Sequence, residues 1–284
     1  MTRRAALWVI AAVLVCALAG LWHWRSLHEA HATGVLIAGG DGGGLPRTAP
    51  ELEGFDATAL NAAAAGALKQ GASALLIMRH GHLIYEAYAG RTDASTPVPG
   101  GELARSLLVM AAGVAVAQHG MLMPAPPLSP DRLAAAIAAA SGRSYPAFLS
   151  RHVWQPLHAA PAYWSPSEVS ARSVDWLRVG ELLLHDGRFE GTQIVPPGWI
   201  ARYSPALFGR DIGIPAGAGL ASLRGPGSTR LWLAPRTDLA ILRVAAEPPP
   251  GVAVDETLAR TIINTLREHP ATGGSSLNDL VPGH

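Results

Sequence analysis

Apolar positions in this chain fall into one nearly unbroken run, several amphipathic segments and a set of short strand-like runs. The run from Gly100 to Gly120 is apolar at nearly every position from Leu103 onward. It shows neither the stripe of a surface helix nor the alternation of a half-buried strand, and a helix that is apolar on all sides is buried. A membrane span needs about 20 apolar residues without charge, so this segment is too short to cross a bilayer. It is expected to form the central helix of a globular domain.

Shorter segments with a helical pattern lie on both sides of this run, at 55–70, 131–141, 145–154, 170–185, 196–202 and 254–268. Short apolar runs bounded by turn residues predict strands at 72–78, 83–88, 220–223, 230–234 and 238–244. The order of elements is helix, hairpin, helices, strands, helix. This order predicts an α+β fold with an antiparallel sheet flanked by helices.

The amino-terminal segment has the pattern of a membrane span. Residues 5–24 form an uncharged apolar run, preceded by Arg3 and Arg4 and ended by Arg25. A run of about 20 apolar residues crosses a bilayer as a helix, and the preceding arginines favour a cytoplasmic amino terminus. Residues 1–26 are therefore expected to be one transmembrane helix in the inner (cytoplasmic) membrane, with the remaining chain on the periplasmic side. A cleaved signal peptide is the alternative, because residues 17–19 read Ala-Leu-Ala.

Composition divides the remaining chain into three parts. Residues 27–49 contain the run GGDGGG and predict a Gly-rich linker. Residues 50–269 carry the predicted elements and form the expected domain. Residues 270–284 contain ATGGSS and predict a flexible tail.

Charge and residue counts exclude several classes of function. The chain has 22 Lys and Arg against 21 Asp and Glu, so it has no basic field for nucleic acid. Its single cysteine, Cys16, excludes a disulfide within the chain. His80 and His82 flank a predicted turn, but no third ligand follows at a metal-site spacing, so we expect solvated turn residues and no metal. The only glycine-rich run of this kind, GGDGGG, does not follow a predicted strand, so it does not match a phosphate-binding loop or a dinucleotide-binding motif. No cofactor is therefore expected.

Five segments resemble the serine hydrolases of the β-lactamase and penicillin-binding-protein superfamily, especially the class C-like esterase and peptidase branch. They are PELEGFDATAL, ALLIMRHGHLIYEAYAG, SGRSYPAFLSRHVWQPL, VGELLLHDGRFEGTQIVPPGWIARY and TRLWLAPRTDLAILRV, and the predicted buried helix follows the second of them. The resemblance covers most of residues 50–269 in order. It implies an antiparallel sheet flanked by helices, with an active site at the start of the buried helix.

The family chemistry that this resemblance implies requires Ser-x-x-Lys at the start of that helix, where the serine attacks a carbonyl and the lysine helps to remove its proton. Here Glu102 lies where the serine belongs and Arg105 where the lysine belongs. A carboxylate is a poor nucleophile in this role, and arginine keeps its proton at any relevant pH. Glu102 and Arg105 are instead expected to pair across one helical turn.

The other two family motifs are also missing. The only lysine, Lys69, has Gly66 three residues before it and Gln70 after it, so neither Ser-x-x-Lys nor Lys-Thr-Gly occurs. No asparagine has a tyrosine two places upstream, so Tyr-x-Asn is absent. The family places that motif in a long insert, whereas only a short proline-rich linker separates Gly120 from Asp131. A reduced helical subdomain is therefore expected.

Several polar residues near the degenerate motifs remain as candidates. Ser106 is the nearest surviving hydroxyl, either a reactive group or a first-turn residue that bonds the backbone. The segment that matches the family's substrate-binding strand contains Arg224, Ser228 and Thr229 as binding candidates. Arg224 and Arg230 are able to hold a carboxylate through two parallel bonds, or else they are solvated residues of a strand edge.

These observations lead to two functional hypotheses. The preferred one is a catalytically inactive relative of the serine hydrolases that binds a cell-wall peptide, a small ester or amide ligand, or a membrane protein partner. The alternative is an active ester or amide hydrolase that uses Ser106 or Ser228 with a histidine such as His119. A serine hydroxyl within about 3 Å of a histidine distinguishes the second hypothesis from the first.

Overall fold

A computed structural model describes residues 34–124, 129–165, 168–208, 219–246 and 256–267. The expected membrane anchor at 1–26 and the expected tail at 270–284 lie outside the described residues. Within the described ranges, no helix has both the length and the apolar character that a membrane span requires.

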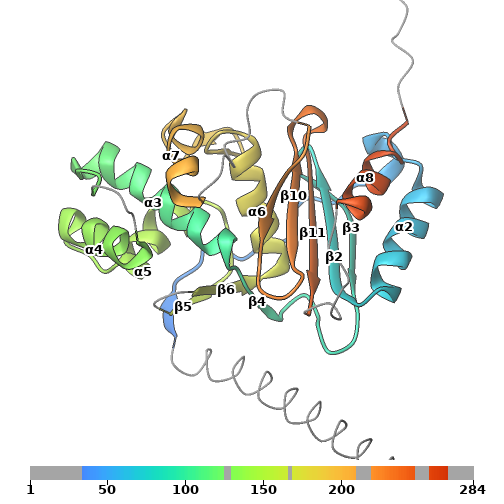
Figure 1. Cartoon of the computed structure of the whole chain (residues 1–284), viewed down its shortest axis with the longest axis horizontal. Helices are drawn as coiled ribbons and strands as arrows, with labels where there is room; N and C mark the ends of the chain where they lie inside the picture. Colours follow the sequence, from blue (N-terminus) through green and yellow to red (C-terminus); the bar gives the residue numbers. More distant parts are fainter. Residues whose placement is uncertain (1–33, 125–128, 166–167, 209–218, 247–255, 268–284) are drawn as a thin grey trace, which may run out of the picture.

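A five-stranded antiparallel sheet forms the centre of the domain (Figure 1). Its strand order is β3-β2-β11-β10-β9, so β9 and β3 are the edge strands. The strands are β2 (Ala72–Arg79), β3 (His82–Tyr88), β9 (Ala221–Arg224), β10 (Arg230–Ala234) and β11 (Leu239–Ala245). The hairpin and the three later strands that the apolar runs predict are thus confirmed.

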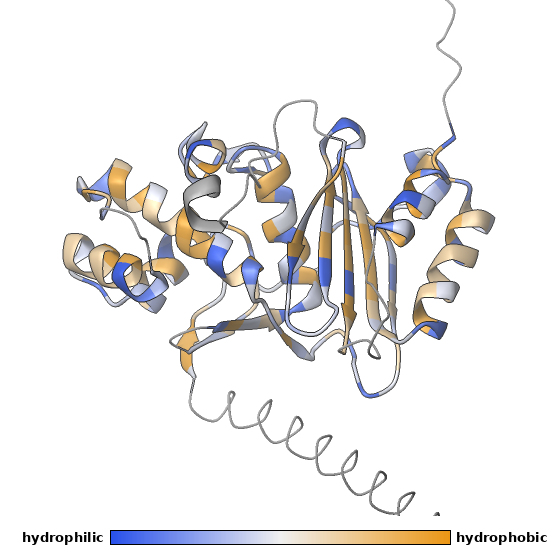
Figure 2. Cartoon of the chain, viewed as in Figure 1, coloured by the Kyte–Doolittle hydropathy of each residue, from blue (hydrophilic) through white to orange (hydrophobic). Residues whose placement is uncertain are grey.

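Helices cover both faces of this sheet (Figure 1). The helices α2 (Ala57–Lys69) and α8 (Thr257–Ile263) lie on one side, and α6 (Ser173–Leu184) lies on the other. Neighbouring residues of a strand point to opposite faces, so Ile241 joins one apolar cluster with Leu60, while Leu242 joins another with Leu177. Because the inner strands are buried on both faces, they are apolar at most positions (Figure 2).

The expected central helix is confirmed as α3 (Glu102–His119). It packs against α4 (Pro130–Ser141), α5 (Tyr145–Leu149), α6 and α7 (Trp199–Phe208). A Cβ atom on Gly113 would lie 2.7 Å from Cδ1 of Trp199, so the glycine allows that ring to lie directly on the helix. The indole Nε1 of Trp199 donates to the carbonyl of Val109 at 2.9 Å.

A second sheet, which the sequence did not predict, lies beside the first. Its strand order is β1-β5-β6-β4, formed by β1 (Val35–Ile37), β5 (Ala162–Ser165), β6 (Glu168–Arg172) and β4 (Pro97–Pro99). Two expectations are corrected by it. The segment 27–49, which was expected to be a flexible linker, contains β1. The helix expected from residue 170 begins only at Ser173, because residues 168–172 form β6 and pair with β4 and β5.

Other boundaries differ from the sequence prediction by a few residues. The helix expected at 145–154 is α5 followed by a π-helical turn, η2 (Ser150–Trp154), and the helix expected at 196–202 starts at Trp199. The terminal helix is α8, which is shorter than the expected 254–268. Short elements complete the described chain: η1 (Pro50–Glu53), β7 (Arg188–Phe189), β8 (Thr192–Gln193) and η3 (Pro235–Thr237).

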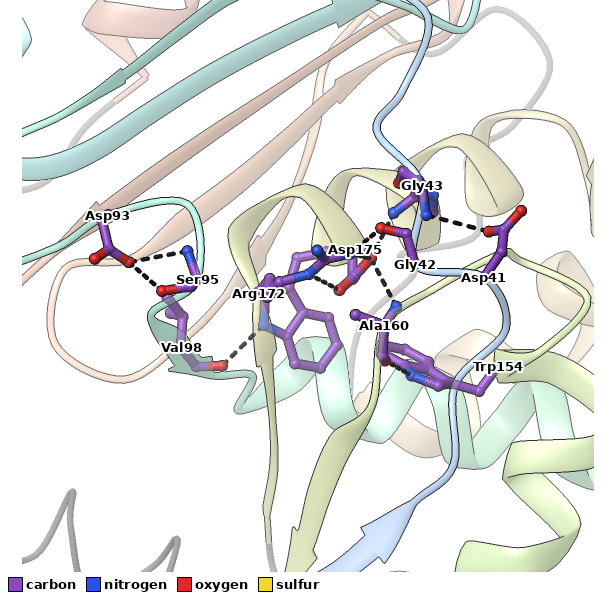
Figure 3. Close-up of polar contacts among 12 residues, drawn as sticks. Asp41, Gly42, Gly43, Asp93, Ser95, Val98, Trp154, Ala160, Arg172 and Asp175 are labelled. Carbon is purple, nitrogen blue, oxygen red and sulfur yellow. Dashed lines mark hydrogen bonds and ion pairs between the residues drawn. The ribbon is translucent and has the colours of Figure 1, made fainter.

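An ionic clamp fastens residues 41–44 to the start of α6 (Figure 3). The buried carboxylate of Asp175 accepts a bond from Nε of Arg172 at 2.9 Å and is also bonded by Arg178. The same two arginines donate to the carbonyls of Gly42 and Gly43. The glycine-rich run is therefore part of the folded domain, because its backbone carbonyls accept bonds from the partly exposed guanidinium of Arg172 and the buried guanidinium of Arg178.

Candidate functional site

The start of α3 is built from a tight junction with β4. Gly101 precedes the helix with φ of +58°, a conformation that glycine adopts without strain. A Cβ atom on Gly100 would lie 2.5 Å from Cη2 of Trp176, so only glycine fits there. The indole of Trp176 also donates to the carbonyl of Val98 at 2.9 Å. These contacts fix where the helix begins, and with it the direction of its first-turn side chains.

Glu102 joins this helix to the edge of the five-stranded sheet. Its Oε2 accepts a hydrogen bond from the backbone N–H of Arg224, the last residue of β9, at 2.8 Å. A Cβ atom on Gly101 would lie 3.0 Å from the carbonyl oxygen of Arg224, which shows how closely the two segments approach. The carboxylate therefore satisfies a backbone donor of an edge strand, a group that has no strand neighbour on its outer side.

A second carboxylate, that of Glu168 at the start of β6, lies under the same junction. Its oxygens accept hydrogen bonds from the backbone N–H groups of Gly100, Gly101 and Val169, each at 2.9 Å. Burial raises the pKa of Glu168, and these backbone donors and the charge of Arg105 oppose that shift. Glu168 thus bonds the two N–H groups that precede the first turn of α3.

Arg105 does not form the expected pair with Glu102. Its side chain is exposed, and its guanidinium makes no hydrogen bond or ion pair with any residue in the described ranges. Instead, Arg105 is one of the residues that line a pocket between α3 and the second sheet.

The pocket has a volume of about 40 Å³ and is mostly apolar, with three polar side chains. It is lined by Ala104, Arg105, Leu108, Pro130, Ala134, Tyr145, Trp164, Glu168 and Val169. The rings of Tyr145 and Trp164 meet edge to face with centroids 6.0 Å apart. Tyr145 is 5% exposed, and its hydroxyl has no hydrogen-bond partner among the described residues. Burial raises the pKa of this hydroxyl, so it is a protonated donor.

Neither a protein-family model nor a curated protein sequence matches the chain. Several solved structures match its fold. A candidate 6-aminohexanoate-dimer hydrolase from Bacillus anthracis is 14% identical with a TM-score of 0.58, covering 86% of this chain and 92% of that one. A β-lactamase from Mycobacterium bovis is 15% identical with a TM-score of 0.52, covering 69% of this chain and 96% of that one. A penicillin-binding-protein homologue from Caulobacter crescentus is 12% identical with a TM-score of 0.52, covering 74% of this chain and 97% of that one.

This chain has the β-lactamase fold. At these identities the likeness establishes the fold alone, and the site must supply the chemistry.

Serine hydroxyls near the start of α3 are bonded to backbone carbonyls. Oγ of Ser106 donates to the carbonyl of Leu103 at 2.7 Å, and Ser106 is 2% exposed. Oγ of Ser228 donates to the carbonyl of Ala246 at 2.6 Å, and Ser228 is equally buried. In the described part of the chain, no serine hydroxyl bonds a histidine ring. Within the described ranges, neither Ser106 nor Ser228 has a histidine or carboxylate partner for its hydroxyl.

The remaining sequence candidates lie elsewhere around the β9–β10 turn and at the far end of α3. Thr229 is buried and its hydroxyl lies 3.4 Å from the carbonyl of Ala245, while Arg224 is exposed at the sheet edge. His119, proposed as a partner for a serine, lies at the other end of α3, where its ring contacts Phe148 and His152. The structure therefore brings Glu102 and Arg224 together but not Ser106 and His119.

The histidines of the β2–β3 turn contact a carboxylate. Nδ1 of His80 and Nδ1 of His82 lie 2.7 and 2.9 Å from the two carboxylate oxygens of Glu53. Among the described residues, no group of three His, Cys, Asp or Glu side chains is placed to hold a metal ion.

Sequence reasoning missed three residues of the pocket, namely Tyr145, Trp164 and Glu168. Tyr145 and Trp164 are aromatic residues in short elements without a clear period, and Glu168 follows a Pro-Ser pair. Their common position depends on the pairing of β5 with β6 and on the packing of α5 beside α3. No motif or spacing signals this arrangement.

Proposed function

We propose that this β-lactamase-fold chain no longer forms an acyl-enzyme and acts by binding a ligand beside α3. The observation that carries the proposal is the hydrogen bond from the backbone N–H of Arg224 to the carboxylate of Glu102. The position that the resemblance assigns to the nucleophilic serine is occupied by a group that links the helix to the sheet. The neighbouring position 105 holds a guanidinium, which cannot accept the proton of a nucleophile.

Electrostatics at this position also oppose acyl transfer. Acyl transfer requires hydrogen-bond donors that are free to stabilise the negative charge on the carbonyl oxygen of the tetrahedral intermediate. The Arg224 N–H at the sheet edge is such a donor, but the Glu102 carboxylate already uses it. A second negative charge beside this carboxylate is repelled, which raises the energy of an oxyanion instead of lowering it.

Binding rather than turnover is supported by the pocket beside Arg105. Ligand sites are typically concave and apolar with a few polar groups, and this pocket has that composition.

We also propose a location for the chain: the apolar run 5–24 anchors it in the inner membrane and places the domain on the periplasmic side. A cell-wall peptide, a small ester or amide, or a membrane protein is then within reach.

Hydrolysis assays with the full-length chain test the proposal. We expect p-nitrophenyl acetate and a chromogenic cephalosporin to be hydrolysed at the rate of buffer alone, with no change in the variants Ser106→Ala and Ser228→Ala. A rate above buffer that either variant abolishes would refute the proposal and establish the active hydrolase, the second hypothesis from the sequence.

A further inference from the structure

Two histidine rings meet over a buried phenylalanine where α3 ends. The ring of His119, the last residue of α3, lies edge to face with that of His152 on the π-helical turn η2, with centroids 5.7 Å apart. His152 also stacks on Phe148 of α5 with centroids 4.4 Å apart, and His119 meets the same phenylalanine edge to face at 5.6 Å. Phe148 is 0% exposed, so these three rings form part of the contact that holds α5 and η2 against α3.

The charges that act on the partly buried ring of His152 are positive. They come from His119 on α3, from Arg151 on η2 and from Arg143 in the turn after α4. Burial and these three charges lower the pKa of His152 below its ordinary value of 6.5. The imidazole therefore accepts a proton less readily in this contact than it does in water.

No carboxylate of the described chain pairs with either ring. η2 packs against α3 and α5, and α5 carries no charged side chain. The other charged residues of α3 and α4 lie in the first turns of these helices, at the pocket end of α3: Glu102, Arg105, Asp131 and Arg132. Protonation of both His119 and His152 therefore places two positive charges side by side without a counter-charge.

We propose that the contact between His119 and His152 is a pH switch that releases α5 and η2 from α3 when both rings are protonated. Two like charges with centres 5.7 Å apart repel each other at a partly buried contact, and histidine gains its charge just below neutral pH. Because α5 carries both Phe148 and the pocket residue Tyr145, this release also loosens one wall of the pocket. The inference goes beyond the proposed function and does not depend on it.

The direction of the pH dependence follows from the lowered pKa of His152. When α5 and η2 separate from α3, the imidazole is released to solvent and its pKa returns towards 6.5, so the open state binds the proton more tightly. The closed state is therefore fully favoured above about pH 6.5. It loses stability as the pH falls from there through the pKa of the closed form.

Hydrogen exchange of the full-length chain, read by mass spectrometry at about pH 7.5 and about pH 5, measures this opening. After correction for intrinsic exchange rates, we expect residues 145–157 to exchange about three- to a hundredfold faster at the lower pH. Coulomb repulsion between the two charges gives this range for dielectric constants between those of water and a protein surface. Peptides from β10 and β11 should show no comparable change, because the opening is local.

Two variants remove one of the charges and keep an aromatic ring. His152→Phe should abolish the acid-induced acceleration, whereas His119→Phe should reduce it to the part caused by burial of His152 and by the two arginines. The matched control is His80→Asn, which removes an exposed histidine from the β2–β3 turn and should leave the acceleration unchanged. Asparagine accepts the positive φ of 49° at this position.

An NMR titration of the His152 ring separates a pH switch from ring packing alone. The pKa of His152 should lie below 6.5 in the original chain, should rise in His119→Phe because a neighbouring charge is removed, and should stay the same in His80→Asn. Three results would overturn the switch: exchange of residues 145–157 that does not accelerate at the lower pH, equal acceleration in β10 and β11, or a His152 pKa that His119→Phe leaves unchanged.

Discussion

At the scale of single residues, two carboxylates at the start of α3 have different tasks. Glu102 is partly exposed and accepts one backbone N–H from the sheet edge, whereas Glu168 is more buried and accepts three N–H groups around the helix start. Both therefore use their negative charge on backbone donors, near the positive end of the helix dipole.

Removal of the Glu102 carboxylate should cost stability rather than activity. Glu102→Ala leaves the Arg224 N–H without its acceptor, and we expect a loss of about 1–2 kcal/mol in the free energy of unfolding. Urea denaturation measures this loss. The control is Glu51→Ala at an exposed position, with an expected change below about 0.5 kcal/mol. Equal stability of the two variants would show that the Glu102 bond does not hold the helix to the sheet.

Glu181 on α6 is a buried carboxyl outside the pocket and should make stability depend on pH. Glu181 is 7% exposed, and burial raises its pKa from the ordinary 4.5 to about 7, while the charge of His185 opposes the shift. The folded chain then binds a proton at this site more tightly than the unfolded chain does. Protonated Glu181 contributes about 3 kcal/mol to the free energy of unfolding. This contribution is fully present below about pH 4.5 and is lost as the pH rises through about 7.

Glu181→Gln should remove this dependence, because an amide stays neutral over the whole range. We predict that the free energy of unfolding of the original chain falls between about pH 4.5 and 7 more steeply than that of the variant. Urea denaturation at several pH values gives both slopes. His185, whose pKa is raised mainly by its bond to Asp238, contributes a fall in both proteins, and this fall is smaller in the variant because the charge of Glu181 adds to the His185 shift. Parallel slopes would rule out an elevated pKa at Glu181.

At the scale of elements, the start of α6 holds the glycine-rich segment 41–44 against the domain. Asp175 is 0% exposed and is bonded by two arginines and by the backbone N–H of Ala160. Arg178 is also buried, so its charge depends on this carboxylate for compensation. Breaking a buried ion pair from one side leaves an uncompensated charge and is strongly destabilising.

Asp175→Ala should therefore lower the free energy of unfolding by about 3–5 kcal/mol, as measured by urea denaturation. Glu256→Ala is the matched control, because Glu256 forms an exposed pair with Arg260 on α8 and its loss should cost less than about 0.5 kcal/mol. Similar losses in the two variants would show that the clamp on residues 41–44 contributes no more than a surface pair.

At the scale of the whole molecule, the elements predictable from the sequence are those with a strong local signal. α3 is apolar on every side and the strands of the five-stranded sheet are apolar runs between turns, so their burial is visible in the sequence. The second sheet carries no such signal. β1 and β4 each have three residues, and β4 contains two prolines, so these strands are defined only by partners distant in the chain.

In the candidate site, too, some residues were predictable from the sequence and others were not. Glu102 and Arg105 were located from the resemblance alone, because the family motif fixes their positions on the helix. The partner of Glu102 is a backbone N–H of β9, and the pocket beside Arg105 is completed by Tyr145 and Glu168. These neighbours come together only through tertiary packing, which no periodic pattern or spacing in the sequence encodes.

The proposed loss of the acyl-enzyme in a chain that keeps the β-lactamase fold is tested most directly by the intact mass of the folded, full-length chain after exposure to a fluorophosphonate and to a fluorescent penicillin. We predict an unchanged mass with both reagents, because no described serine hydroxyl bonds a histidine ring and the family resemblance puts Glu102 where the nucleophilic serine belongs. A stoichiometric adduct that maps to one serine would contradict the account and identify the nucleophile.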